Sequence, residues 1–205
     1  DSPDNGFQPP GLIKLSSTTL DVGGLLLDYG STFGFGTATH SLTLYRHQSG
    51  ALVFGAGTVQ WSWGLDDEHD FPGTPSDRDM RQATVNLFAD MGVQPATLGG
   101  GVVYATTSTD TTAPTSTITS PADGTVVGLG SNVTVTGTTT DVGGRVGGME
   151  ISTDGGATWQ RVAGRDSWSY AFTANQIGSF TIQTRAVDDS GNIETPGAGV
   201  TIEVG

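Results

Sequence analysis

The sequence of 205 residues contains no cysteine. Disulfides, thiolate nucleophiles and cysteine-bound zinc are therefore excluded. Basic residues are scarce as well, because eight lysines and arginines stand against 21 acidic residues and give a formal net charge of -13. Residues 1–109 contain eleven acidic and four basic residues, and residues 110–205 contain ten acidic and four basic residues. Neither half offers the basic surface that nucleic acids or anionic lipids require.

Long apolar runs are also missing, and no stretch approaches the roughly 20 residues of a membrane span. Charged residues make up only 14% of the chain and glycine occurs 32 times, so threonine, serine and glycine provide much of the polar surface. This composition favours short strands joined by many turns. An acidic chain with a single lysine is typical of exported bacterial proteins. We therefore expect a secreted or cell-surface location.

The clearest break in the sequence pattern lies near residue 110. Residues 99–113 consist mostly of glycine, threonine and serine, with a short apolar patch at Val102–Tyr104, and such a segment cannot build a core. We predict a mainly β protein of two domains. Residues 1–98 form the first domain, residues 99–113 the linker and residues 114–205 the second domain.

The C-terminal domain is predicted to be an immunoglobulin-like β-sandwich. Apolar and polar residues alternate there in short segments separated by turn signals, which is typical of strands with one buried face. The predicted strands are 115–120, 132–138, 146–153, 158–162, 167–173, 179–187 and 200–204. Without paired cysteines, the domain is not of the antibody type.

Three segments of this domain carry a family resemblance. Asp110–Pro114 followed by Ser120–Gly124 resembles the start of a bacterial Ig-like domain of secreted multidomain proteins. Ala186–Asn192 resembles the F strand and the following turn of the same domains. The resemblance implies a spacer or an interaction module rather than an enzyme.

The N-terminal residues are predicted to form a partial α/β piece that ends in one helix. Strand-like segments are 12–15, 25–27, 41–46 and 51–63. Ser76 is a suitable N-cap for a helix over about 77–91, and Gly92 suits the position after it. The predicted buried stripe consists of residues spaced three and four apart, namely Met80, Ala83, Thr84, Leu87, Phe88 and Met91.

The segment Ser49–Asp66 resembles the C-terminal end of an N,N-dimethylformamidase large-subunit-like domain, and the helix Met80–Gly92 extends the resemblance. That domain is similar to glutamine-amidotransferase-like, flavodoxin-type folds. The resemblance implies amide hydrolysis at an iron held by tyrosine and glutamate. The family's ligand motifs have no counterpart from residue 1 onward, so no role passes to Tyr29, Tyr45 or Glu68. No catalytic residue and no cofactor are expected in this chain.

One motif points to a structural hairpin. Ser152, Asp154, Gly156 and Trp159 fit the Asp-box pattern S-x-D-x-G-x-T-W, which recurs in sialidase propellers. The carboxylate of such a motif accepts hydrogen bonds from turn amides, and the tryptophan packs under the hairpin. A propeller needs many copies and this chain has one, so the motif predicts a turn and no propeller.

Two groups of acidic residues are metal-site hypotheses. Asp66, Asp67 and His69 lie in an acidic loop and offer ligands for Ca²⁺, Mg²⁺ or a transition metal, although a solvated loop is the simpler interpretation. Calcium at the turns of the sandwich is the second hypothesis. Its ligands would be Asp188, Asp189, Asp154 and Glu150.

Three functions stay open. The first is a non-catalytic fragment of a secreted bacterial multidomain protein, whose Ig-like module contacts neighbouring domains or a cell-surface polymer. The second is part of an amide hydrolase whose catalytic residues lie upstream. The third is a carbohydrate-binding module, for which Trp61 and Trp63 would supply stacking rings, although core packing is the simpler role for both. Unpaired strand edges also predict a dimer formed by edge-strand pairing.

Overall fold

The computed structural model describes residues 6–70 and 73–205. The chain forms two compact units. The first consists of the residues up to Val53 together with Asp110–Gly205, and the second is Phe54–Thr109. The boundary before Asp110 lies where the composition of the sequence changes. The first unit, however, combines the N-terminal strands with the C-terminal domain. This grouping differs from the predicted division into domains 1–98 and 114–205.

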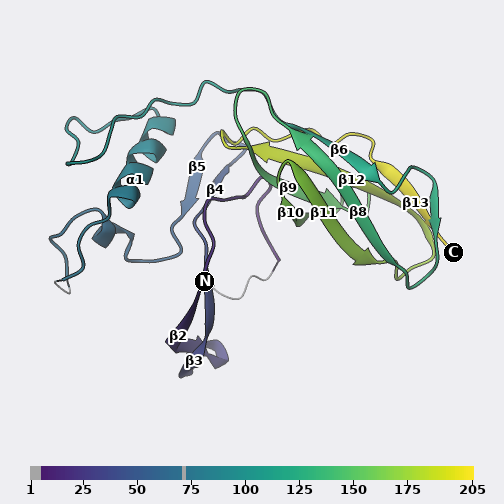
Figure 1. The fold of residues 1–205 in the computed structure, drawn as a ribbon, viewed down its shortest axis with the longest axis horizontal. Coiled ribbons are helices and arrows are strands. Elements are labelled where there is room, and N and C mark those ends of the chain that lie inside the picture. Colours follow the sequence, from purple (N-terminus) through teal and green to yellow (C-terminus); the bar gives the residue numbers. More distant parts are fainter. Residues whose placement is uncertain (1–5, 71–72) are drawn as a thin grey trace. The chain divides into compact units, whose positions relative to one another are not determined.

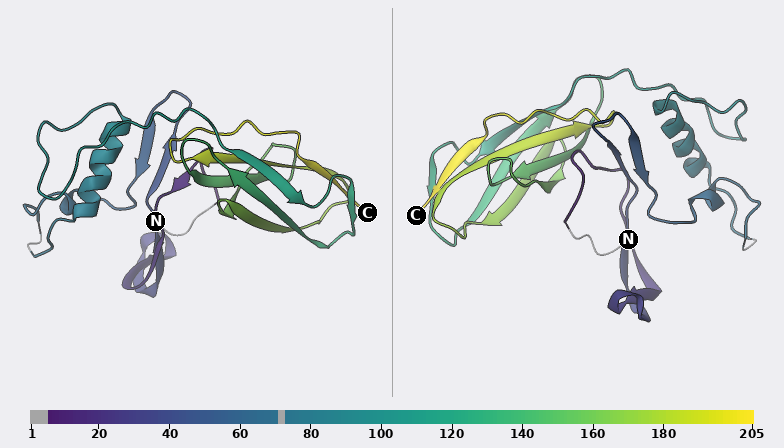
Figure 2. Two further views of the ribbon diagram at one scale, coloured as in Figure 1. Left: turned by 45° about the horizontal axis from the view of Figure 1, so that its top comes forward. Right: turned by 180° about the vertical axis from the view of Figure 1, so that it is seen from behind.

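The C-terminal domain is a β-sandwich of eight strands (Figures 1 and 2). Their hydrogen-bonded order is β6-β8-β11-β10-β9-β12-β13-β7, and β10 joins the two layers because it pairs with both β11 and β9. The strands are β6 (Thr115–Ser120), β7 (Thr125–Val127), β8 (Asn132–Thr140), β9 (Val146–Ser152), β10 (Gln160–Gly164), β11 (Ser167–Thr173), β12 (Gly178–Asp188) and β13 (Val200–Val204).

The core of the sandwich is built from the alternating apolar positions of its strands. Val135, Ile151, Ile182 and Ile202 have no exposed surface, and Met149 is 1% exposed. Their side chains come from β8, β9, β12 and β13 and pack in one cluster with Trp168 of β11. The mainly β fold and the predicted immunoglobulin-like sandwich are thus confirmed. The short strand β7 was not predicted.

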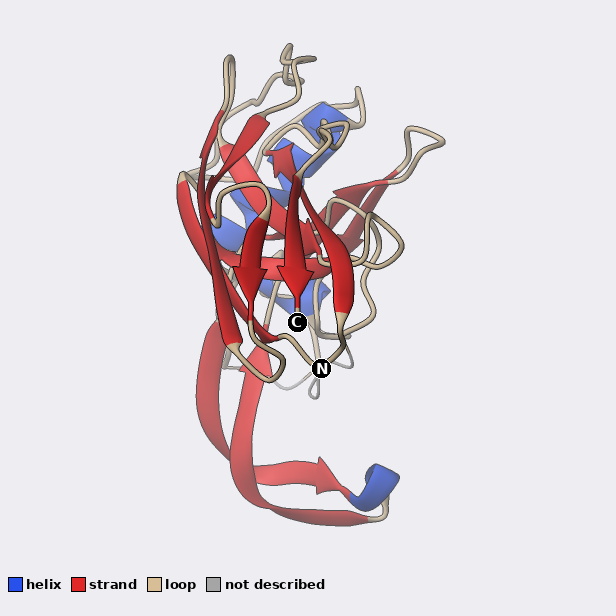
Figure 3. Ribbon diagram, turned by 90° about the vertical axis from the view of Figure 1, so that its right-hand side faces the viewer, coloured by secondary structure: helices blue, strands red, loops and turns tan. Residues whose placement is uncertain are grey.

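The N-terminal residues form two small sheets. β1 (Ile13–Lys14), β4 (Thr43–Arg46) and β5 (Leu52–Gly55) make a three-stranded sheet. β2 (Thr18–Leu27) and β3 (Thr32–His40) make a separate antiparallel hairpin. Figure 3 shows this hairpin as a long two-stranded ribbon that ends in a 3₁₀ turn, η1 (Asp28–Gly30).

Two strand predictions for this part were wrong. The hairpin was missed apart from 25–27, because its glycines and threonines interrupt the apolar alternation on which the prediction relied. The long strand 51–63 is also wrong, since β5 ends at Gly55 and Gly57 has a φ of +66°. The following residues form a 3₁₀ turn, η2 (Trp61–Gly64).

The second unit contains α1 (Arg78–Asp90), the one α-helix among the described residues. The predicted helix is present, but its N-cap is Asp77 and not Ser76, because Asp77 Oδ1 accepts the Met80 amide at 2.8 Å. Gly92, with a φ of +78°, lies after the helix as predicted. The predicted buried stripe is displaced. Val85 and Ala89 are the buried residues, whereas Phe88 is 42% exposed.

None of the described helices is both long and apolar enough to span a membrane.

Candidate functional site

The Asp-box residues lie together in the hairpin between β9 and β10. Asp154 Oδ1 accepts the Ser152 hydroxyl at 2.7 Å and the Thr158 amide at 2.8 Å. The Trp159 indole donates to the Gly156 carbonyl at 3.1 Å. Gly155 and Gly156 have φ values of +71° and +92°, which L side chains rarely adopt. Every polar group of the motif is used within the turn, so the arrangement is structural.

The electrostatics of Asp154 agree with this role. Desolvation acts to raise its pKa, but hydrogen bonds from Thr158 and Ser152 outweigh that effect and hold the pKa below its ordinary 3.8. The carboxylate is therefore ionised at neutral pH and serves as an acceptor for the turn. It offers no proton for acid catalysis.

Trp61 and Trp63 do not form a shared stacking surface. Both lie in η2 and both are half-buried. The Trp61 indole donates to Thr84 Oγ1 at 3.2 Å and its ring meets Phe54 edge-on. Trp63 stacks on the imidazole of His69, with ring centroids 5.1 Å apart. Residues two apart on a 3₁₀ turn point in different directions, so the strand geometry assumed for a sugar platform is absent.

The acidic loop gives its side chains partners other than a metal. Asp66 Oδ1 accepts the Glu68 amide at 2.8 Å, and Asp67 Oδ1 accepts the Ser76 amide at 2.5 Å. The two ring nitrogens of His69 lie 2.6 and 3.0 Å from the carbonyls of Asp70 and Thr74. Both nitrogens then act as donors, and these hydrogen bonds raise the pKa of His69 above 6.5. In this arrangement both ring nitrogens of His69 are occupied by backbone carbonyls.

Residues 11–46 contact the sandwich at several points within the first unit. The Gly11 amide donates to Glu150 Oε1 at 3.2 Å, and Arg161 Nη1 donates to the Leu12 carbonyl at 2.7 Å. Ile13, only 3% exposed, is buried beside Gly147 of β9. A Cβ on Gly147 would lie 3.2 Å from Ile13, so the glycine permits this close approach.

A further contact lies at the other end of the same segment. Arg46 Nε and Nη2 both donate to the Ser190 carbonyl, at 3.3 and 3.2 Å. Ser190 belongs to the turn after β12, so the segment contacts two separate parts of the sandwich. We call these contacts of Gly11, Leu12, Ile13 and Arg46 with the sandwich the N-terminal interface.

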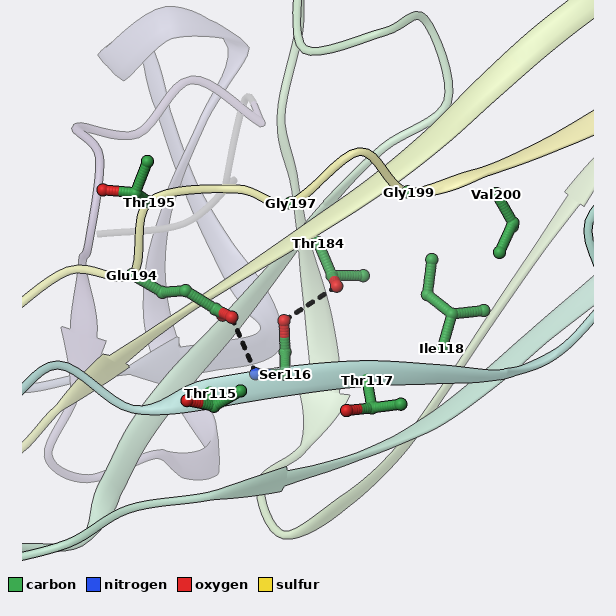
Figure 4. A pocket seen from close by; sticks show the side chains of 10 residues that line it. All are labelled: Thr115, Ser116, Thr117, Ile118, Thr184, Glu194, Thr195, Gly197, Gly199 and Val200. Carbon is green, nitrogen blue, oxygen red and sulfur yellow. Dashed lines mark hydrogen bonds between the residues drawn. The ribbon is translucent and has the colours of Figure 1, made fainter.

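A polar groove runs between β6 and the segment before β13 (Figure 4). One of its lining residues is Glu194, whose Oε1 accepts the Ser116 amide at 2.8 Å and whose Oε2 accepts the Ala186 amide at 2.9 Å. The Ser116 and Thr184 hydroxyls lie 2.8 Å apart beside it. Glu194 thus ties β6 to β12, and its carboxylate is occupied by backbone amides rather than available to a substrate.

Two family models match this chain. Residues 1–76 match the family described as N,N-dimethylformamidase beta subunit-like, C-terminal, and residues 114–186 match the family described as Bacterial Ig domain. The chain carries a dimethylformamidase-like segment followed by a bacterial Ig domain. Both predicted resemblances are confirmed in their predicted order, with two corrections: the first family is described by the beta subunit and not the large subunit, and its match ends at residue 76, before the helix that was expected to extend it.

No curated protein matches the sequence. Among solved structures, the fibronectin(III)-like modules of Clostridium thermocellum CbhA are similar to 44% of this chain over 94% of their own length, at 19% identity and a TM-score of 0.38. The PKD domain of an M14-like peptidase from the Thermoplasmatales archaeon SCGC AB-540-F20 is similar to 45% of this chain over 92% of its own length. That match has 18% identity and a TM-score of 0.36.

Tyr29, Tyr45 and Glu68 lie in three different parts of the chain. Tyr29 lies in the η1 turn with its side chain fully exposed, while Tyr45 lies on β4. The structure gives no reason to assign either residue a role. Glu68 lies in the acidic loop, where its amide contacts Asp66.

The acids expected to share calcium are only partly brought together. Asp154 follows the end of β9, whereas Asp188 pairs with Val146 at the opposite end of that strand. Glu150, in the middle of β9, is paired with Arg185. The predicted four-acid set is therefore wrong. Asp188 instead lies near Asp110 and Asp141, and among the described residues these three have ligand atoms within 4.8 Å of one another.

Proposed function

We propose that the bacterial Ig domain is a non-catalytic module that holds residues 11–46, part of the dimethylformamidase-like segment, in a fixed position on its surface. The N-terminal interface carries this proposal, since it combines two hydrogen-bonded contact points with a buried isoleucine. A flexible spacer would not need such contacts. In this view the module is an interaction domain of a secreted multidomain protein, and its partner is the neighbouring domain of its own chain.

Hydrogen exchange tests this function. We expect the amides of residues 11–14 to exchange as slowly as those of β9, because the interface excludes water from them. Arg161→Met removes the donor to the Leu12 carbonyl and should speed exchange at residues 11–14 at least tenfold while leaving β11 unchanged. Arg165→Met, at an exposed position of the same domain, is the matched control. Fast exchange at residues 11–14 in the unchanged protein would instead indicate a flexible tether.

A role in amide hydrolysis is the second candidate, favoured by the match of residues 1–76 to the dimethylformamidase-like family. On this view the catalytic residues lie elsewhere in the parent protein. Release of dimethylamine from N,N-dimethylformamide by the purified chain, supplied with iron, would place catalysis within these residues. A carbohydrate-binding function receives no support, because Trp61 and Trp63 are each packed against a neighbouring ring.

The hairpin of β2 and β3 supports a dimer. Its exposed apolar side chains include Leu20, Leu26, Phe33 and Phe35, exposed by 59%, 56%, 74% and 92%. Among the described residues neither strand has a second partner, and a second copy of the hairpin would pair its edges and cover these side chains.

Sedimentation velocity checks the dimer. We expect the unchanged chain to form a dimer whose share rises with protein concentration. Phe35→Lys should remain a monomer even at ten times the concentration at which the unchanged chain is dimeric, because an uncompensated charge would enter the paired surface. Val126→Lys changes an exposed valine on β7, at the edge of the sandwich, and should leave the dimer intact. A monomer at all concentrations of the unchanged chain contradicts the proposal.

A further inference from the structure

Three aspartates converge at one end of the sandwich. Asp110 precedes β6, Asp141 directly follows β8, and Asp188 ends β12. β6 and β8 are antiparallel, with Thr115 opposite Thr140, so the beginning of one lies beside the end of the other. The three side chains bring carboxylate oxygens within 4.8 Å of one another.

Asp141 distinguishes this cluster from a group of solvent-exposed acidic residues. Both of its carboxylate oxygens are buried and neither has a hydrogen-bond partner among the described residues. No described lysine or arginine forms an ion pair with it. A buried charge without a partner is costly, and the positions of Asp110 and Asp188 add like charges beside it.

The surrounding residues hold the carboxylates close together. A Cβ on Gly144 would lie 2.5 Å from Asp189 Oδ1, 2.7 Å from Asp110 Oδ2 and 3.0 Å from Asp141 Oδ2. A side chain at this position would displace at least one of these carboxylates. Asp188 has a fixed orientation, since its Oδ1 accepts the amides of Ser190 and Asn192 at 2.9 and 2.8 Å.

Asn192 connects two of the three acids. Its side-chain amide donates to Asp188 Oδ2 at 2.7 Å and to the Asp110 carbonyl at 3.1 Å. Burial of Asp188 and the neighbouring charge of Asp110 raise the pKa of Asp188 above 3.8, although hydrogen bonds from Asn192 and Ser190 oppose this. A bound cation would reduce the repulsion between carboxylates that lie this close together.

We propose that Asp110, Asp141 and Asp188 bind one Ca²⁺ ion. Calcium prefers six to eight oxygen ligands at about 2.3–2.6 Å. Ligand oxygens about 2.4 Å from a common ion lie no more than about 4.8 Å apart, which matches the observed spread. The set contains carboxylates without histidine or cysteine, and this disfavours zinc and copper. Magnesium, with shorter bonds and a stricter octahedron, fits less well.

The position of the site gives calcium a structural consequence. Asp110 is the first residue after Phe54–Thr109, the second compact unit. Binding would fix the chain at Asp110 to the ends of β8 and β12. The ion would thus hold the point at which the chain enters the Ig domain, in addition to the N-terminal interface.

Calorimetric titration of the full chain with CaCl₂, after removal of metal with a chelating resin, tests the proposal. We expect one site with a Kd of roughly 10⁻⁵ to 10⁻³ M, the range of sensor and extracellular calcium sites. Asp141→Asn, which keeps the shape of the side chain, should weaken binding at least tenfold. Glu203→Gln removes one exposed charge from β13 of the same domain and should change the Kd less than twofold.

Thermal melting gives an independent result that a merely structural role of Asp141 would not produce. In EDTA, Asp141→Asn should melt at or above the temperature of the unchanged protein, because one uncompensated buried charge is removed. In 10 mM CaCl₂ the order should reverse. If Asp141→Asn does not fold, Asp110→Asn replaces it, since the amide oxygen of asparagine can still accept the Thr112 amide.

Three results would overturn the proposal. These are no binding heat and no melting shift with calcium, equal calcium affinity of the unchanged chain and Asp141→Asn, or binding of MgCl₂ as tight as binding of CaCl₂.

Discussion

Replacing Glu150 by alanine is expected to lower the free energy of unfolding by about 3–5 kcal/mol, the usual cost of removing one partner of a buried ion pair. Glu150 Oε2 accepts Arg185 Nε at 2.6 Å, and the two side chains are only 8% and 16% exposed. The Arg185 guanidinium also lies 4.1 Å above the Trp159 ring. The variant would leave this cation buried without its carboxylate.

The second oxygen of Glu150 links this residue to the proposed function. Glu150 Oε1 accepts the Gly11 amide at 3.2 Å, so the alanine variant also removes a contact of the N-terminal interface. We therefore expect faster hydrogen exchange at Gly11 as well as lower stability. The two effects have one cause, because a single carboxylate connects Arg185 of the sandwich with the dimethylformamidase-like segment.

Urea unfolding followed by circular dichroism measures the loss, with Glu203→Gln as the control expected to stay within about 0.5 kcal/mol. The double variant Glu150→Leu/Arg185→Met should recover part of the stability, because neither charge is then left unpaired. A loss below about 1 kcal/mol for Glu150→Ala would contradict the account, since the pair would then behave like an exposed one.

The sequence predicted the sandwich well because its strands have one buried face. Thr115–Ser120 and Ser167–Thr173 were predicted with their observed ends, since alternation and turn residues agree there. The hairpin of β2 and β3 could not be found in this way. Phe33 and Phe35 are exposed, so no buried face imposes a pattern on their strand.

The candidate calcium site shows a second limit of prediction from the sequence. The sequence suggested calcium at Asp188, Asp189, Asp154 and Glu150 on the assumption that two turns meet at one end of the sandwich, and it gave no reason to consider Asp110 or Asp141. Asp110, Asp141 and Asp188 are far apart in the chain, and only the antiparallel pairing of β6 with β8 explains why the first two meet. Each of the three aspartates flanks the same end of the sandwich. Strand direction, combined with the predicted strand ends, was the signal that could have located them.

Gly137→Ala is expected to destabilise the Ig domain by at least about 3 kcal/mol, at the upper end of the usual cost of overpacking. Gly137 lies in β8 opposite Trp168 of β11 and Ile118 of β6. A Cβ there would lie 2.1 Å from Trp168 Cζ2 and 2.3 Å from the Thr117 carbonyl oxygen. The tryptophan is buried and the carbonyl belongs to a neighbouring strand, so neither can easily move away.

Thermal melting checks this prediction, and a loss of about 3 kcal/mol corresponds to a fall of roughly 12–24 °C for a domain of this size. Gly197→Ala is the matched control, because no atom lies within 4 Å of its added Cβ, and it should melt within about 2 °C of the unchanged chain. The double variant Gly137→Ala/Trp168→Leu separates the two clashes. If the double variant recovers none of the lost stability, the clash with the Thr117 carbonyl causes most of the loss. If Gly137→Ala melts at the temperature of the unchanged chain, the close packing of Trp168 over β8 is contradicted.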